Sequence, residues 1–182
     1  MKPYKVLDLY CGSGSVSIGL KAAGFLHATG IDIKPEAKKW YPYKFICQDV
    51  LSLSIDFLQQ FDFIWASPPC QAHTVALKGR EHNHLDLIPQ TRDLLIASGK
   101  PYVIENVPLA PLRKDLVLCG TMFDLKCVRH RVFESSIPLK AYFNCICNKV
   151  NKYIPRWVNE KVPDNKIQYF TLLIHNHYEI HY

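Results

Sequence analysis

The sequence predicts an α/β fold in which a mostly parallel, twisted sheet is flanked by helices. Short apolar runs alternate with stretches of helical periodicity, which is typical of βαβ units. A glycine-rich turn follows the first apolar run. Hydrophobic residues make up 48% of the chain and charged residues 21%, as in globular domains.

The expected elements follow one another at short intervals. Strands are predicted at residues 4–10, 27–33, 44–50, 61–66 and 100–107, with two later strands within 116–125 and 130–136. Helices are predicted within 15–25, ending at Gly24, from Pro35, and within 85–98, ending at Gly99. Residues 167–182 are expected to form a terminal strand or hairpin.

Bulk properties limit the class of protein. A chain of 182 residues suits one domain with a real core, and no apolar run reaches the length of a membrane span. Seven cysteines without an export signal indicate reduced thiols in a cytoplasmic compartment. The net charge of +6 is compatible with a polyanionic partner and equally with a mildly basic enzyme.

One group of residues indicates a cofactor site. Gly12 and Gly14 lie in the turn after the first strand, and Asp32 ends the second strand, where an acid typically binds ribose hydroxyls. The third glycine of the dinucleotide fingerprint is out of register, which argues against NAD. Taken alone, the two glycines are as well explained by turn geometry.

A second group indicates chemistry. Cys70 follows a strand and two prolines, which stiffen the chain and present the thiol at the sheet edge. Glu105 ends the fifth strand at the same edge, and Arg129 and Arg131 share a face if their segment is extended. Singly, Cys70 could be a buried filler or a metal ligand, and the charged residues could be solvated. Together they favour a nucleophile in a polar site.

These motifs resemble those of the C5-cytosine-specific DNA methyltransferase family. The similar segments are DLYCGSGSVSIGL, GIDI, QDV, SPPCQ, ENV and RHRVF, which occur in the family's order between residues 7 and 133. The resemblance implies a Rossmann-like, S-adenosylmethionine-dependent methyltransferase fold. It also implies a catalytic domain at 1–137 and a short extension at 138–182 that lacks a full target-recognition domain.

The resemblance implies a role for each catalytic residue. Cys70 would add to C6 of cytosine, Glu105 would protonate N3, and Arg131 would hold O2, with Arg129 in support. Addition to C6 activates C5 to attack the cofactor methyl group, which is the logic of covalent catalysis.

The resemblance also assigns binding residues. Those of the S-adenosylmethionine site are Tyr10, Cys11, Gly12, Gly14, Asp32, Ile33, Asp49 and Pro68. Those of the substrate site are Gln71, Asn106, Lys78 and Arg80, with His82 and His84 as further phosphate contacts in a loop that closes over a flipped base. A mobile surface loop is the alternative for that segment.

The implied activity is methylation of double-stranded DNA in a bacterial or phage-infected cell, as in restriction-modification. Family members are usually longer, so a protein partner that supplies target recognition is one expectation. The alternatives are a tRNA cytosine methyltransferase and a non-catalytic remnant that binds cofactor or nucleic acid.

No metal site is predicted. Cys145-x-Cys147 lacks the usual two-residue spacing and a second matching pair, although His175, His177 and His181 follow. Cysteines 11, 47, 119 and 127 are expected to be packing residues.

Overall fold

A computed structural model describes residues 4–25, 27–73, 84–123, 125, 128–141 and 143–147. Its strands are β1 Lys5–Leu9, β2 His27–Asp32, β3 Lys44–Cys47, β4 Phe63–Ala66, β5 Tyr102–Asn106, β6 Leu116–Cys119 and β7 His130–Ser135. Its α-helices are α1 Ser15–Ala22, α2 Ile55–Leu58 and α3 Ile88–Ser98. Short 3₁₀ turns are η1 Pro35–Lys39, η2 Val50–Ser52, η3 Gln71–His73 and η5 Gly120–Phe123.

The strands form one sheet in the order β3-β2-β1-β4-β5-β7-β6. All pairs from β3 to β5 are parallel, whereas β7 runs antiparallel to both β5 and β6. The prediction of a mostly parallel sheet flanked by helices is therefore confirmed.

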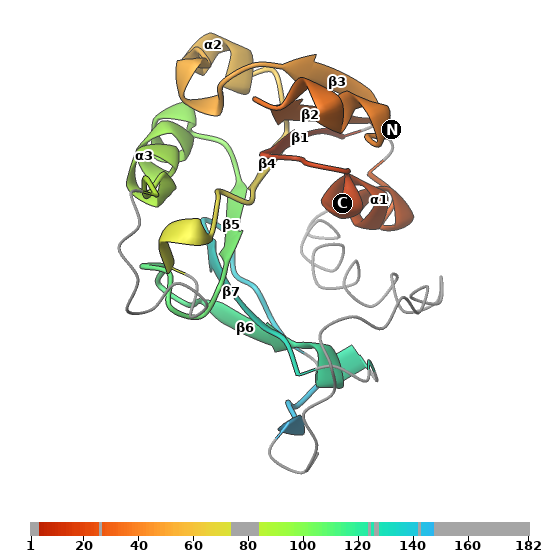
Figure 1. Cartoon of the computed structure of the whole chain (residues 1–182), viewed down its shortest axis with the longest axis vertical. Helices are drawn as coiled ribbons and strands as arrows, with labels where there is room; N and C mark the ends of the chain where they lie inside the picture. The colour runs from red at the N-terminus through yellow and green to blue at the C-terminus, as the bar shows by residue number, and fades with distance from the viewer. Residues whose placement is uncertain are drawn as a thin grey trace, which may run out of the picture.

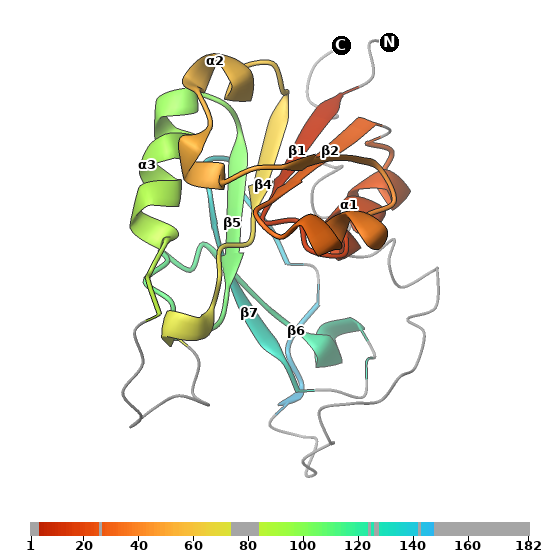
Figure 2. The same ribbon diagram turned by 45° about the horizontal axis from the view of Figure 1, so that its top comes forward.

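The helices lie on two sides of this sheet, with α2 and α3 on one side and α1 on the other (Figure 1; Figure 2). Side chains alternate between the two layers along each strand. In β1, Leu7 and Leu9 enter the core cluster beneath α3, and Val6 enters the cluster beneath α1. The central parallel strands β1, β4 and β5 are buried on both faces, which explains their apolar runs, whereas the edge strand β3 is not.

Local signals set the element ends. Helix α1 ends in a Schellman motif, in which Phe25 N–H donates to Leu20 O and Gly24 N–H donates to Lys21 O, with Gly24 at φ 90°. Helix α3 ends at Gly99, which is also left-handed. Strand β3 is shorter than predicted because the Asp49 side chain caps the turn η2. The helix predicted from Pro35 is the 3₁₀ turn η1.

Part of the C-terminal extension is outside the described residues, and with it the hairpin predicted at 167–182. The proposed boundary at 137 follows the last strand of the sheet. Within the described part of the chain, no helix is both long and apolar enough to cross a membrane.

A buried ion pair ties α3 to β7. Glu134 is fully buried and accepts hydrogen bonds from Arg92 Nε at 2.8 Å and Arg92 Nη2 at 2.9 Å. Burial alone would raise the pKa of Glu134, but the bonds from Arg92 and from the Arg113 N–H hold it below its ordinary value. The Arg113 side chain is half exposed and approaches Glu134 at 3.5 Å.

We expect Arg92→Ala to lower the free energy of unfolding by about 3 kcal/mol, because it strips a buried carboxylate of its main partner. Arg113→Ala serves as the matched control and should cost about 1 kcal/mol, because its exposed guanidinium is screened by water. Urea denaturation of both variants measures the difference. Equal losses would contradict this assignment of the pair.

Candidate active site

The predicted site residues gather at the carboxyl ends of the parallel strands. Strands β2 and β3 follow one another on one side of β1, whereas β4 and β5 lie on its other side. The direction in which strands are added therefore reverses between β1 and β4. Ligands of open α/β sheets bind outside the carboxyl ends at such a switch point. The loops after β1, β2 and β3 form one half of this edge, and those after β4 and β5 form the other half (Figure 2).

The loop after β1 is held in an uncommon backbone conformation. Tyr10 has φ 58°, Gly12 has φ 49° and Gly14 has φ 87°. A Cβ atom on Gly14 would lie 2.7 Å from Pro42 Cδ, whereas one on Gly12 would meet nothing within 4 Å. Gly14 is thus required by packing, and Gly12 leaves open space beside the backbone.

Side chains from other elements support this loop. Tyr10 Oη lies 2.8 Å from Thr91 Oγ1 on α3, which anchors the one strained non-glycine residue of the loop. Cys11 is buried, and a Cβ on Gly30 would lie 2.7 Å from its sulfur. Cys11 therefore packs against β2, and its burial raises the pKa of the thiol.

A buried polar network lies beneath the loop, and its residues were not among those predicted from the sequence. Ser17 Oγ donates to Asp8 Oδ2 at 2.7 Å and lies 2.6 Å from Tyr41 Oη. All three residues are buried, and Asp8 Oδ1 has no hydrogen-bond partner among the residues that the structure describes. Burial raises the pKa of Asp8 from 3.8 to about 7, although the Ser17 bonds oppose the shift.

This raised pKa predicts a stability that falls as pH rises. From pH 4 to 7 the unfolded state ionises Asp8 while the folded state keeps its proton, so unfolding becomes easier; above pH 7 the loss is complete. Between pH 5 and 8 the free energy of unfolding of the unaltered protein should fall by about 2–3 kcal/mol more than that of Asp8→Asn, because one pH unit corresponds to about 1.4 kcal/mol.

Urea denaturation of both proteins at the two pH values measures this difference. Asp56→Asn is the control, because Asp56 is an exposed carboxyl in the first turn of α2. A gap between Asp8→Asn and the parent that is the same at both pH values would contradict the raised pKa.

Asp32 joins the first two loops. Its Oδ2 accepts the Gly12 N–H at 2.9 Å, and its Oδ1 accepts the Lys34 N–H at 2.9 Å. Each carboxylate oxygen can accept a second hydrogen bond. Beside it, the Ile33 side chain is 63% exposed.

Asp49 completes this half of the edge. It is exposed, and its Oδ1 accepts a hydrogen bond from the Leu51 N–H at 3.0 Å. Burial of the Tyr10 ring raises the pKa of Tyr10, and the charge of Asp49 adds to this rise. Hydrogen bonding thus joins Asp32 to Gly12, and the charge of Asp49 acts on Tyr10.

The loop after β4 is fixed by the strand on each side. Ser67 N–H donates to Leu9 O at 3.1 Å, and Asn106 Nδ2 donates to Pro68 O at 2.9 Å. Asn106 is buried, and its Oδ1 accepts the Val107 N–H. Its amide is therefore used within the protein, where it holds the loop that carries Cys70.

Cys70 is half-buried and is adjacent to an ion pair. Arg131 Nε lies 2.7 Å from Glu105 Oε1, and a charge on Cys70 acts on the Arg131 guanidinium. Burial raises the pKa of Glu105, and the charges of Arg131 and Arg129 reduce that rise. Arg129 is exposed and acts at longer range. Glu105 and Arg131 are therefore paired, and Cys70 lies within electrostatic range of Arg131.

The proposed substrate loop is only partly described. Gln71 is exposed in η3, and His73 Nε2 lies 3.0 Å from Asp86 Oδ1, which brings the two ends of the loop together. His84 is exposed. Lys78, Arg80 and His82 lie outside the described residues, as does Cys127.

Residues 4–114 match the family model described as C-5 cytosine-specific DNA methylase. The chain belongs to this family. It is 31% identical over 118 residues to the Type II methyltransferase M1.HphI of Haemophilus parahaemolyticus, a match that covers 56% of this chain and 32% of that protein. The chain therefore spans about a third of the length of this relative.

Solved structures share the fold. The Dnmt2 methyltransferase of S. pombe has a TM-score of 0.55 at 21% identity, over 77% of this chain and 53% of its own. The methyltransferase EhMeth of Entamoeba histolytica has a TM-score of 0.55 at 19% identity, and the match covers 78% of this chain and 55% of EhMeth. A prophage-encoded protein of E. coli, described as a DNA modification methyltransferase, has a TM-score of 0.55 at 19% identity. This match covers 71% of this chain and 45% of the E. coli protein.

The family uses S-adenosyl-L-methionine, and the residues present fit this cofactor. The open space at Gly12 allows close approach to the backbone, the Asp32 carboxylate has remaining acceptor capacity for ribose hydroxyls, and exposed Ile33 offers an apolar surface for a base. The cofactor half of the edge thus has the shape and the chemistry that the family requires.

Proposed function

We propose that this family member transfers a methyl group from S-adenosyl-L-methionine to C5 of cytosine in DNA. The observation that carries the proposal is the Glu105–Arg131 ion pair of 2.7 Å beside Cys70, at the carboxyl edge of the sheet. The pair places a carboxyl that can accept and transfer a proton next to a cation, and Cys70 offers a nucleophile. These are the three functions that activation of a pyrimidine ring needs.

In the proposed reaction, the Cys70 thiolate forms a bond to C6 of the ring. The C5–C6 electron pair becomes available at C5, and N3 takes a proton from Glu105. When bound, the cofactor would supply an electrophilic methyl group to C5, and its methyl–sulfur bond would break to leave a neutral thioether. A base then removes the C5 proton, the C5–C6 double bond forms again, the thiolate leaves, and N3 returns its proton to Glu105. Covalent addition converts one difficult substitution into easier steps.

The electrostatics of the site support these roles. Burial raises the pKa of Glu105, which favours a proton-donating role toward N3 over that of an ordinary exposed carboxyl. The Arg131 guanidinium keeps its charge in proteins and has donors to spare for O2 of the base. Asn106 acts as a positioning residue through Pro68, in place of the substrate contact that the family resemblance assigned to it.

We propose double-stranded DNA with a flipped cytosine as the substrate, because the target carbon is not accessible inside the stacked duplex. The net charge of +6 supports a polyanionic partner. Gln71, Lys78 and Arg80 are the proposed contacts from the loop before α3. We also propose that a protein partner contributes target recognition, which co-expression with a candidate partner would reveal as a gain in methylation.

Incubation with tritiated S-adenosylmethionine tests the proposal directly. Duplex DNA, tRNA and free cytosine nucleotides are offered separately, and cofactor binding is measured in parallel. We expect label in duplex DNA, recovered as 5-methylcytosine. Label in tRNA alone would contradict the DNA substrate, and cofactor binding without label in any acceptor would contradict catalysis and favour a binding protein.

A further inference from the structure

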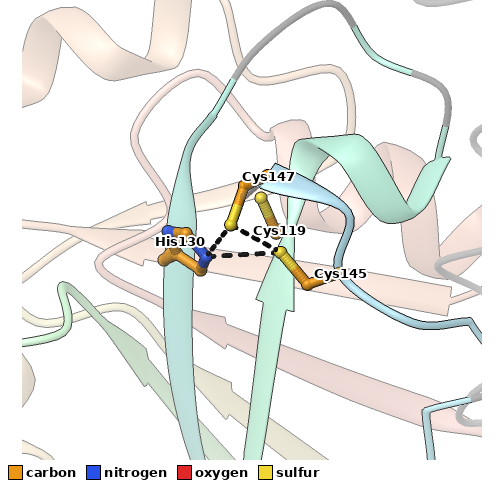
Figure 3. Close-up of side chains that lie close together, drawn as sticks. All are labelled: Cys119, His130, Cys145 and Cys147. Carbon is orange, nitrogen blue, oxygen red and sulfur yellow. Dashed lines mark hydrogen bonds between the residues drawn. The ribbon is translucent and has the colours of Figure 1, made fainter. Parts of the chain in front are cut away.

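A cluster of three cysteines and one histidine lies where β6 ends and β7 begins, next to the site described above but not part of it. Its members are Cys119, His130, Cys145 and Cys147, and their ligand atoms all lie within 4.8 Å of one another (Figure 3). From the sequence no metal site is predicted here, because Cys145-x-Cys147 lacks the usual two-residue spacing and a second matching pair, and Cys119 is expected to be a packing residue.

Strand register creates half of the cluster. Cys119 is the last residue of β6 and His130 the first of β7, and they are direct cross-strand partners. Directly opposed residues of an antiparallel pair project to the same face with Cβ atoms about 5 Å apart. A hydrogen bond of 3.2 Å from Gly120 N–H to Arg129 O closes the ladder next to this pair.

The second half comes from the segment after β7. Cys145 and Cys147 place their sulfur atoms 3.6 and 3.7 Å from His130 Nε2 (Figure 3). Thr121 Oγ1 donates to Cys119 Sγ at 3.3 Å and lies 3.6 Å from Cys145 Sγ, so one hydroxyl supports two of the thiols. Such outer hydrogen bonds typically orient metal ligands.

The distances agree with a tetrahedral site. Zinc bonds of about 2.3 Å to sulfur and 2.0–2.1 Å to nitrogen give tetrahedral S–N edges of about 3.6 Å and S–S edges of about 3.8 Å. The two S–N distances match this edge. The Cys145–Cys147 sulfur atoms are closer, at 3.0 Å, and a metal would separate them by a small side-chain rotation.

We propose that Cys119, His130, Cys145 and Cys147 bind one structural Zn²⁺ ion. Three thiolates and one imidazole form a closed, soft donor set that suits zinc and leaves no position for a substrate. Cys145 is exposed and Cys147 half-buried, so the ion can enter from solvent, whereas Cys119 is buried beneath.

The ion would connect the chain after β7 to the β6–β7 hairpin close to the catalytic residues. His130 lies between Arg129 and Arg131, and alternation along a strand directs its side chain to the face opposite Arg131. A metal bound to His130 therefore fixes the backbone from which Arg131 reaches Glu105. The role is positional, and it does not depend on the proposed reaction.

Metal analysis of the full chain, purified under reducing conditions, tests the site. We expect about one zinc ion per chain by mass spectrometry. Cys147→Ser and His130→Ala should each lower zinc content at least about fivefold, whereas Cys47→Ser should retain it because Cys47 lies on β3 outside the cluster. Circular dichroism shows whether each variant is folded.

Cobalt substitution of the unaltered chain gives a test that needs no variant. A tetrahedral Cys3His site with Co²⁺ should show thiolate-to-metal charge transfer and intense visible ligand-field bands, which zinc then abolishes. Failure of the reduced protein to bind either ion would overturn the proposal. So would a Cys145–Cys147 disulfide that persists under reducing conditions, or zinc content that survives in both folded variants.

Discussion

Cys70→Ala is expected to lower the rate of methyl transfer by a factor on the order of 10⁴ to 10⁶, the size of effect seen when a covalent nucleophile is removed. The thiol is half-buried beside Arg131, and its loop is held from two sides by Leu9 O and Asn106. The alanine side chain fits the same loop, so the loss should be chemical. Single-turnover transfer of tritiated methyl groups to duplex DNA measures it.

Cofactor binding provides the internal control for this variant. Because most of the proposed S-adenosylmethionine residues lie in the loops after β1, β2 and β3, and Cys70→Ala leaves Pro68 unchanged, the cofactor dissociation constant of the variant should stay within about twofold of that of the unaltered protein. A methyl-transfer rate of Cys70→Ala within tenfold of that of the unaltered protein would show that Cys70 is not the nucleophile. A parallel loss of cofactor affinity would show that the loop, and not the thiol, was disrupted.

Glu105→Gln is expected to lower kcat by about 10² to 10⁴-fold, which is the usual contribution of a positioned proton donor. The amide keeps the size of the carboxyl but cannot transfer a proton to N3, and it removes the ion pair with Arg131. Because burial raises the pKa of Glu105, the pH dependence of the rate gives a second test of its role. The rate should fall as pH rises through that pKa in the unaltered protein, and Glu105→Gln should lack this dependence.

Asp115→Asn is the matched control for the carboxyl substitution. Asp115 also pairs with an arginine, at 2.9 Å to Arg113 Nη2, but on the surface at the start of β6. We expect its kcat to remain within about twofold, because exposed ion pairs contribute little. Equal losses in the two variants would point to a general effect of removing a carboxylate.

Most of the fold was predictable because its signals are local. Continuous apolar runs mark strands that are buried on both faces, and Gly24 and Gly99 mark the helix ends where the backbone turns left-handed. The antiparallel direction of β7 was not assigned, because it depends on how the chain between β5 and β7 returns to the sheet. No periodicity within residues 130–136 encodes that direction.

The candidate site was predictable to the extent that parallel strands bring their ends together. Cys70 follows β4 and Glu105 lies near the end of the neighbouring strand β5, so topology brings both to the same edge of the sheet. Asp8, Ser17 and Tyr41 were missed because their contact depends on how a helix face meets a strand and a distant turn. The polar positions at Asp8 and Ser17, inside otherwise apolar elements, were the available signal.

Two further findings depended on tertiary register. The side chain of Asn106 was assigned to the substrate by family resemblance, whereas in the structure it binds the Pro68 carbonyl, a contact set by the spacing of β4 and β5. Cys119 and His130 become neighbours only through the β6–β7 register. Sequence spacing rules for metal sites do not cover ligands that are brought together in this way.

Covalent trapping tests the central claim, that Cys70 is the nucleophile, most directly. Duplex DNA containing 5-fluorocytosine is incubated with the protein and S-adenosylmethionine, and fluorine at C5 prevents the proton removal that would release the thiolate. We predict a denaturant-stable adduct that peptide mass spectrometry locates at Cys70 and that Cys70→Ala does not form. An adduct that persists in Cys70→Ala, or that maps to another cysteine, would contradict the account.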